Sequence, residues 1–167
     1  MPCIEKPDPS YFQDVLVSNL TFYLKRLNEL GARKFVVSDV GPLGCIPYVR
    51  ALEFMPTGEC SASANRVTEG YNKKLKRMVE KMNQEMGPES QFLYVNMYDI
   101  VTEIIQHYRQ YGFDNALDPC CGGSFPPFLC IGAAKLLTLP RQFHCLNGCS
   151  LIPFFDKWSR VTAQVVA

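Results

Sequence analysis

The sequence predicts an α/β fold built around a parallel sheet. Two short apolar runs, residues 34–40 and 91–96, are rich in β-branched and aromatic residues and have the length of buried strands. Helical periodicity precedes the first run, separates the two runs and follows the second. This alternation of helix and strand implies a right-handed crossover between parallel strands. With 167 residues, 47% of them hydrophobic, one domain or one large piece of a domain is expected.

The first helix is expected to begin near residue 10. Asp8 or Ser10 can cap its N-terminus, Pro9 is tolerated in the first turn, and Gly31 is placed to end it in a left-handed turn. Apolar residues at three- and four-residue steps predict one buried face. They are Phe12, Val15, Leu16, Leu20, Tyr23, Leu24 and Leu27.

The strand at 34–40 runs into a loop that contains the first candidate site residues, Gly41, Pro42, Leu43 and Gly44. Loops at the carboxyl ends of parallel strands line the ligand crevice of open α/β sheets, so these residues are candidates for the lining of a substrate groove. A tight turn that needs glycine explains them at least as well.

A long amphipathic helix is expected at 64–86, ended by Gly87 and Pro88, and a shorter helix is expected after the strand at 91–96. The methionines of the long helix are interpreted as core residues. No confident element is predicted from Arg109 onward. The apolar face of the long helix consists of Val67, Tyr71, Leu75, Met78, Val79, Met82 and Met86.

Charge makes nucleic acid an unlikely class of partner. The 17 basic and 16 acidic residues leave a net charge of +1, which cannot gather a phosphate backbone over a broad surface. The basic run at 73–81 lies among Glu69, Glu80 and Glu85 and is interpreted as a solvated helix face. No stretch is long and apolar enough to be predicted as a membrane span.

The cysteine content and the N-terminus point to different compartments. Eight cysteines are typical of oxidised, secreted proteins, whereas residues 1–8 lack the apolar core of a secretory signal. As written, the chain would be cytoplasmic by default. We expect instead a secreted parent whose front end is absent from this sequence. Asn19 begins an Asn-Leu-Thr sequon and is a glycosylation candidate if the chain enters the lumen.

Four motifs, in order, resemble the plant branch of the GDSL lipase and esterase family. They lie at residues 30–37, 41–47, 71–72 and 111–122, and the resemblance covers about residues 10–130. It implies a three-layer α/β/α sandwich with a parallel sheet, the SGNH or flavodoxin-like architecture, truncated here at the N-terminal side. It also implies a secreted ester hydrolase without a cofactor, acting on acyl lipids or acetyl esters through a Ser-His-Asp mechanism.

The residues that the family uses for catalysis are not found in the sequence. The resemblance places the Gly-Asp-Ser motif and the oxyanion glycine and asparagine before the first helix, and residues 1–9 do not contain them. The family's Asp-x-x-His is matched only by Asp156, a candidate remnant of the aspartate, with Ser159 where histidine is expected. We therefore assign no catalytic residue. Residues 1–167 are interpreted as one partial domain with a divergent tail at about 131–167, inactive by itself.

The alternatives are a non-catalytic interaction module and, less favoured, a zinc-binding protein. His107 and His144 lack an accompanying nucleophile motif, and each is interpreted as an ordinary helix or surface histidine. Disulfides are favoured over zinc because paired Cys-x-x-Cys spacing is absent, so no metal is predicted. Cys45 with Cys60, and Cys120 or Cys121 with Cys130, are the favoured pairs. The zinc alternative would use Cys120, Cys121, Cys130, His144, Cys145 and Cys149. Self-association through an open sheet edge is also expected.

Overall fold

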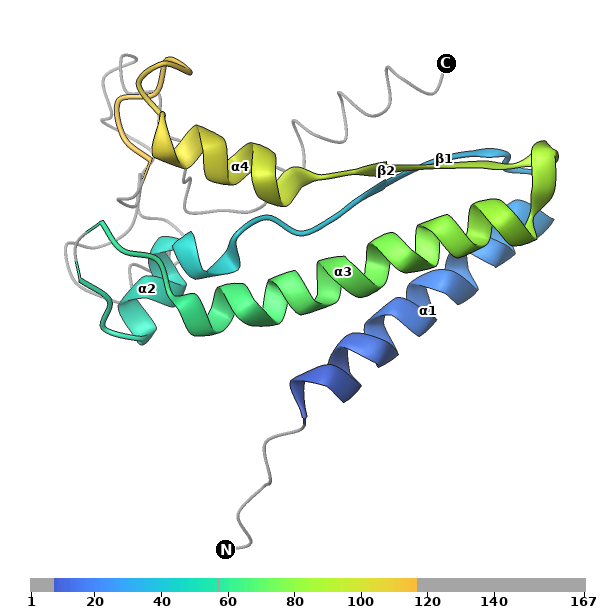
Figure 1. Cartoon of the computed structure of the whole chain (residues 1–167), viewed down its shortest axis with the longest axis horizontal. Helices are drawn as coiled ribbons and strands as arrows, with labels where there is room; N and C mark the ends of the chain where they lie inside the picture. Colours follow the sequence, from blue (N-terminus) through green and yellow to red (C-terminus); the bar gives the residue numbers. More distant parts are fainter. Residues whose placement is uncertain (1–7, 57, 117–167) are drawn as a thin grey trace, which may run out of the picture. The chain divides into compact units, whose positions relative to one another are not determined.

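The structure, a computed structural model, describes residues 8–56 and 58–116 (Figure 1). Within the described part, residues 8–43 and 62–101 form one compact unit, and residues 44–56, 58–61 and 102–116 belong to a second. The elements in chain order are α1 (Pro9–Glu29), β1 (Lys34–Ser38), the 3-10 helix η1 (Leu43–Cys45), α2 (Pro47–Leu52), α3 (Ala62–Glu85), the 3-10 helix η2 (Gly87–Glu89), β2 (Gln91–Val95) and α4 (Met97–Gln106).

The predicted parallel pair of strands is confirmed. β1 and β2 pair in parallel from Lys34 opposite Gln91 to Ser38 opposite Val95, with α3 in the connection between them. β1 ends at Ser38 and not at Val40 as expected, although the amide of Asp39 still donates to the carbonyl of Val95 at 3.1 Å. The α/β class is therefore confirmed.

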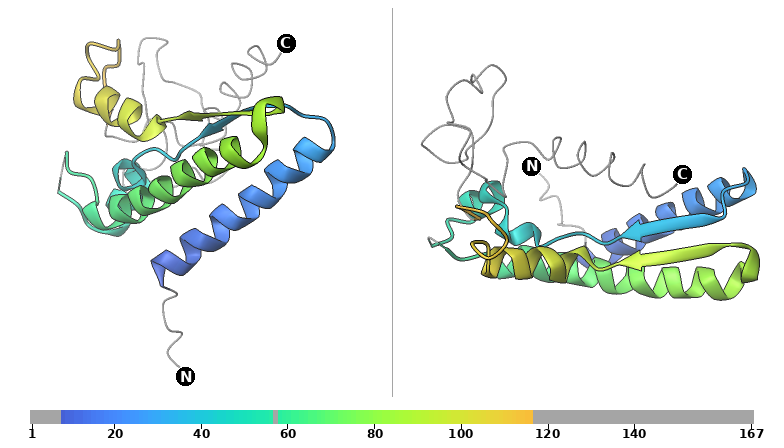
Figure 2. Two further views of the ribbon diagram at one scale, coloured as in Figure 1. Left: turned by 45° about the vertical axis from the view of Figure 1, so that its right-hand side comes forward. Right: turned by 90° about the horizontal axis from the view of Figure 1, so that it is seen from above.

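The core of the first unit lies between the two strands and α3, which run along each other in both views of Figure 2. The rings of Phe35 and Phe92 stack with their centroids 4.5 Å apart, on the face of the sheet that packs against Leu75 and Met82 of α3. Met78 and Met82 are core residues, as the sequence predicted, whereas Met86 is half-buried beside the core and Val67, also assigned to the buried face, is 39% exposed. Side chains on the other face of the strands remain exposed, with Val36 at 46% and Leu93 at 56%.

The predicted buried face of α1 is largely exposed, which corrects the sequence-based expectation. Only Leu24 of the predicted set is fully buried, whereas Phe12, Tyr23 and Leu27 are exposed. Within the described part, α3 is the main element that α1 contacts. A helix with one helical neighbour buries a narrow seam, and the wide stripe of α1 would suit a helix that is also covered by a second neighbour.

The termini of α1 agree with the expected chemistry. The carboxylate of Asp8 accepts a hydrogen bond from the amide of Ser10 at 3.0 Å and caps the helix. Gly31 follows the helix with φ of 104°, the left-handed conformation expected of a glycine at this position. Within the described residues, no helix combines the length and apolar character needed to cross a membrane.

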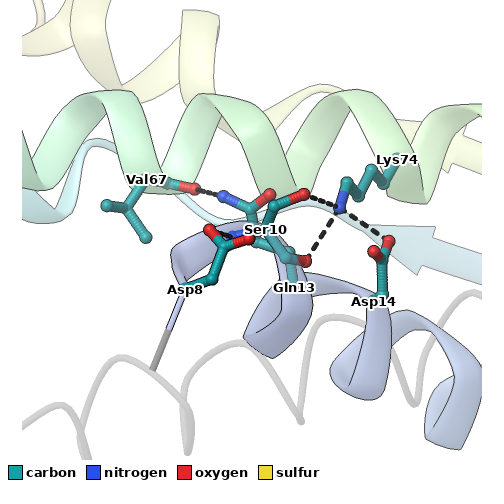
Figure 3. A network of polar contacts seen from close by, with 6 residues as sticks. All are labelled: Asp8, Ser10, Gln13, Asp14, Val67 and Lys74. Carbon is teal, nitrogen blue, oxygen red and sulfur yellow. Dashed lines mark hydrogen bonds and ion pairs between the residues drawn. The ribbon is translucent and has the colours of Figure 1, made fainter. Parts of the chain in front are cut away.

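Polar contacts join the first half of α1 to α3 (Figure 3). Gln13 is buried, and its Nε2 donates to the carbonyl of Val67 at 2.9 Å. At this crossing a Cβ built on Gly70 would lie 2.6 Å from Gln13 Nε2, so glycine allows the two helices to approach. One turn further on, Lys74 forms an ion pair with Asp14 at 2.6 Å and donates to Ser10.

Candidate functional site

The carboxyl end of β1 is organised by a buried carboxylate. Asp39 follows the strand directly and is only 7% exposed. Its Oδ1 accepts hydrogen bonds from the amides of Met97 at 2.6 Å and Tyr98 at 3.0 Å, and its Oδ2 accepts one from the hydroxyl of Tyr94 at 2.6 Å. The two amides belong to the first turn of α4, where free N–H groups and the helix dipole favour a negative charge. Asp39 therefore ties the end of β1 to the start of α4.

A buried amide side chain holds the next residue of the loop. Asn72 on α3 accepts from the amide of Val40 at 3.1 Å and donates to the carbonyl of Val40 at 2.7 Å. These bonds satisfy the backbone groups of Val40 at the point where the pairing of the strands has stopped. Asp39 and Asn72 together hold the entry of the loop that contains the candidate groove residues.

The four candidate groove residues differ in their surroundings. Pro42 and Gly44 are buried, Gly41 is half-buried, and Leu43 is 40% exposed at the start of η1. A Cβ built on Gly41 would meet the side chain of Val101 at 3.7 Å, an ordinary contact, and its φ is not in the left-handed region. The turn therefore does not require glycine at position 41. Leu43 is the member of the four whose side chain is exposed.

Two tyrosines whose hydroxyls bond to carboxylates, Tyr94 of β2 and Tyr98 of α4, have raised pKa values and stay neutral near neutral pH. Burial, and then the hydrogen bond to Asp39, raise the pKa of Tyr94 above its ordinary value. Burial, and then the hydrogen bond to Glu69 at 2.7 Å, raise the pKa of Tyr98 to about 12. Both phenols therefore act as hydrogen-bond donors near neutral pH, and neither supplies a base.

Asp39, Asn72 and Tyr94 were not identified by the sequence reasoning as site residues. Asp39 fell inside the predicted strand, where an acid near the end of an apolar run, separated from Gly41-Pro42 by Val40 alone, was the available signal. Asn72 lies on the stripe of α3 that also carries Leu75 and Val79. A polar residue on an otherwise apolar stripe indicates a specific buried hydrogen-bond partner.

The disulfide favoured by the sequence for the loop before α3 is present. Cys45 and Cys60 are bonded, with their Cα atoms 4.4 Å apart. Inside this loop the buried Arg50 donates from Nε to the carbonyl of Glu59 at 2.6 Å and from Nη2 to the carbonyl of Pro56 at 3.3 Å. A covalent bond and a buried guanidinium therefore both order the loop.

The remaining candidates are separate from this site or lie outside the described residues. Asn19 is exposed on α1, and His107, just after α4, pairs with Glu103 at 3.0 Å. The described residues contain no group of three side chains suited to hold a metal ion. The candidates outside the described residues are Cys120, Cys121, Cys130, His144, Cys145, Cys149, Asp156 and Ser159.

Comparison with known proteins finds one family over most of the chain. The sequence model of the GDSL-like lipase/acylhydrolase family matches residues 3–158. The Arabidopsis thaliana protein GDSL esterase/lipase At5g41890 is 47% identical over 129 residues, which are 75% of this chain and 35% of that protein. A second, GDSL esterase/lipase At2g23540, is 40% identical over 136 residues, covering 80% of this chain and 35% of the relative. The chain spans about a third of the length of these curated relatives.

Proposed function

The chain belongs to the GDSL-like lipase/acylhydrolase family, and we propose on this basis that it forms the rear portion of a carboxylic-ester hydrolase domain that acts on acyl lipids or acetyl esters. The observation that carries the proposal is the 47% identity, over three quarters of this chain, to a protein named as an esterase/lipase. In this proposal the described residues provide part of the scaffold. The nucleophile and the oxyanion donors come from sequence outside these 167 residues.

The carboxyl end of β1 supports a groove at the loop of residues 41–44. Ligands in open α/β sheets bind beyond the carboxyl ends of the strands, and Asp39 and Asn72 hold the loop at that end. Leu43 is the exposed side chain of the loop and would contact the acyl part of an ester. Positioning by buried polar side chains is the usual way in which a scaffold keeps a site rigid.

We propose that the 167-residue polypeptide does not hydrolyse esters by itself. The sequence contains no Gly-Asp-Ser, and serine needs an adjacent base to become a nucleophile. Asp156 stays a candidate remnant of the family aspartate, with Ser159 in the place of histidine. Residual catalysis after loss of triad residues depends on an intact oxyanion hole, which this sequence is proposed to lack.

A chimera tests the hydrolase proposal directly. In the Arabidopsis relative that is 47% identical, the segment aligned with residues 10–130 would be replaced by these residues. Hydrolysis of p-nitrophenyl butyrate would then be measured for the chimera and for the intact relative. Retained turnover is expected, and a folded chimera without turnover would contradict the proposal. The isolated polypeptide should show neither saturable turnover nor a serine labelled by a fluorophosphonate; either result would contradict its proposed inactivity.

The second candidate function is a non-catalytic interaction module. It is favoured by the exposed apolar side chains of α1 and of one sheet face, among them Phe22 at 65% and Leu93 at 56%. Exposed apolar side chains mark interaction sites where they gather into a patch. We propose self-association through the open strand edge, so size-exclusion chromatography of the isolated chain should show oligomers. A monodisperse monomer would contradict the proposed self-association and leave the chimera test unaffected.

The proposed environment of the parent protein is extracellular. The disulfide between Cys45 and Cys60 supports this location, because such bonds persist in oxidising compartments. Asn19 is exposed on α1 and remains a glycosylation candidate under the same proposal.

A further inference from the structure

A groove of about 270 Å³ lies between α1 and α3, on two helices of the same compact unit that run beside each other in Figure 1. Its apolar lining residues are Met78 and Met82, whose side chains are mostly buried; we call this apolar part the floor. Its rim carries Lys25 from α1 and Arg77 and Lys81 from α3. We call this feature the α1–α3 groove. It is separate from the loop of residues 41–44 at the carboxyl end of β1.

The rim has more positive than negative charge. Glu85 is the single carboxylate among the lining residues, and it pairs with Lys25 at 3.5 Å and with Lys81 at 3.4 Å. Both pairs are long and exposed, and such pairs contribute little to stability, so an incoming carboxylate can replace Glu85 at small cost. Within the described part of the chain, Arg77 has no ion pair or hydrogen bond through its side chain.

The lining selects one class of ligand. The planar fork of an arginine binds a carboxylate through two parallel hydrogen bonds. A lysine beside it adds positive charge and has no fixed hydrogen-bonding plane of its own. An apolar floor next to the cations favours a ligand with an apolar tail over a simple anion. The groove is slightly smaller than typical ligand pockets of about 300–1,000 Å³, so one short tail fits better than the two tails of a phospholipid.

We propose that the α1–α3 groove binds an aliphatic carboxylic acid of medium length, with its carboxylate between Arg77 and Lys81 and its tail on the floor formed by Met78 and Met82. Binding needs neither the nucleophile nor the loop of residues 41–44. Failure of this proposal and failure of the proposed hydrolase function are therefore distinguishable, because the first is a binding measurement and the second is a rate.

Isothermal titration calorimetry of the 167-residue chain with sodium octanoate tests the proposal. Saturable binding of about one octanoate per chain is expected, and binding should weaken at high salt because the rim is exposed. Octanoate should bind more tightly than hexanoate, because the longer tail covers more of the apolar lining. Acetate, inorganic phosphate and uncharged 1-octanol should all bind at least tenfold more weakly than octanoate.

Charge variants give effects of opposite sign. Arg77→Gln and Lys81→Gln should each weaken octanoate binding by about fivefold, the upper range for an exposed ion pair. Glu85→Gln should tighten binding, because it removes the carboxylate that competes for Lys25 and Lys81. Lys73→Gln is the matched control, since it removes one exposed cation of α3 outside the groove and should leave the affinity unchanged. Circular dichroism would first establish equal helix content in all four variants.

Several results would overturn the proposal. Equal affinity for phosphate and octanoate would identify an unspecific anion site, and equal affinity for 1-octanol would identify an unspecific apolar surface. Binding to anionic vesicles without binding of free octanoate would assign the groove to a lipid surface. Identical losses in Arg77→Gln and Lys73→Gln would show that only the overall charge of α3 matters.

Discussion

Asp39 should be among the most sensitive positions of the described structure. Replacing it by alanine leaves the amides of Met97 and Tyr98 and the hydroxyl of Tyr94 without their acceptor in a largely buried place. Each unsatisfied buried group costs about 1–3 kcal/mol, partly relieved where water can enter. We expect Asp39→Ala to lower the free energy of unfolding by about 3–5 kcal/mol, while Asp39→Asn, which retains an acceptor oxygen, should lose about 1–2 kcal/mol.

The assay is urea unfolding followed by circular dichroism, with Glu89→Gln as a control that removes one exposed carboxylate. If Asp39→Ala does not fold, the smaller loss in Asp39→Asn still tests the reasoning. Faster hydrogen exchange at the amides of Met97 and Tyr98 should accompany the loss, because these are the groups that Asp39 binds. A loss below about 1 kcal/mol for Asp39→Ala, or unchanged exchange at both amides, would refute this account of the strand end.

Three further predictions concern the helix crossing, the tyrosines and the disulfide. Gly70→Ala should destabilise the chain by about 1 kcal/mol, because displacing the side chain of Gln13 outweighs the gain in helix propensity. In a Gln13→Ala background the same substitution should stabilise the chain by a similar amount. An equal effect of Gly70→Ala in both backgrounds, measured by urea unfolding, would contradict the close approach of Gly70 to Gln13. Because the pKa of Tyr98 is raised in the folded state, its contribution to stability should be complete below pH 10 and be lost as the pH rises through about 12. Across this window the free energy of unfolding should fall less steeply with pH in Tyr98→Phe. An unchanged slope in the variant would exclude Tyr98 as a source of the pH dependence. Replacing Cys45 and Cys60 by serine should cost about 3 kcal/mol for a loop of this length, and adding reductant to the unsubstituted chain should cost at least as much, because it breaks this bond together with any other disulfide. Equal unfolding curves with and without reductant would show that the bond contributes nothing.

The elements and the core of the first unit could be predicted from local pattern. The period of the apolar residues of α3 identified Met78 and Met82 as core residues, and the β-branched run before Gly41 identified β1. Gly31 was placed correctly because only a glycine readily adopts the left-handed turn after a helix. These features depend on neighbouring residues in the chain, so the amino-acid sequence alone specifies them.

The covering of α1 and the polar contacts around β1 were decided by tertiary structure. Periodicity showed that α1 has an apolar face, but which part is buried depends on the neighbour that covers it, and here α3 covers a narrow seam with Leu24. Asp39 reaches the amide of Met97, 58 residues further along the chain, only because the parallel pairing brings the end of β1 to the start of α4. The α1–α3 groove likewise combines residues separated by more than 50 positions. Such sites depend on the relative placement of elements, which local pattern does not contain.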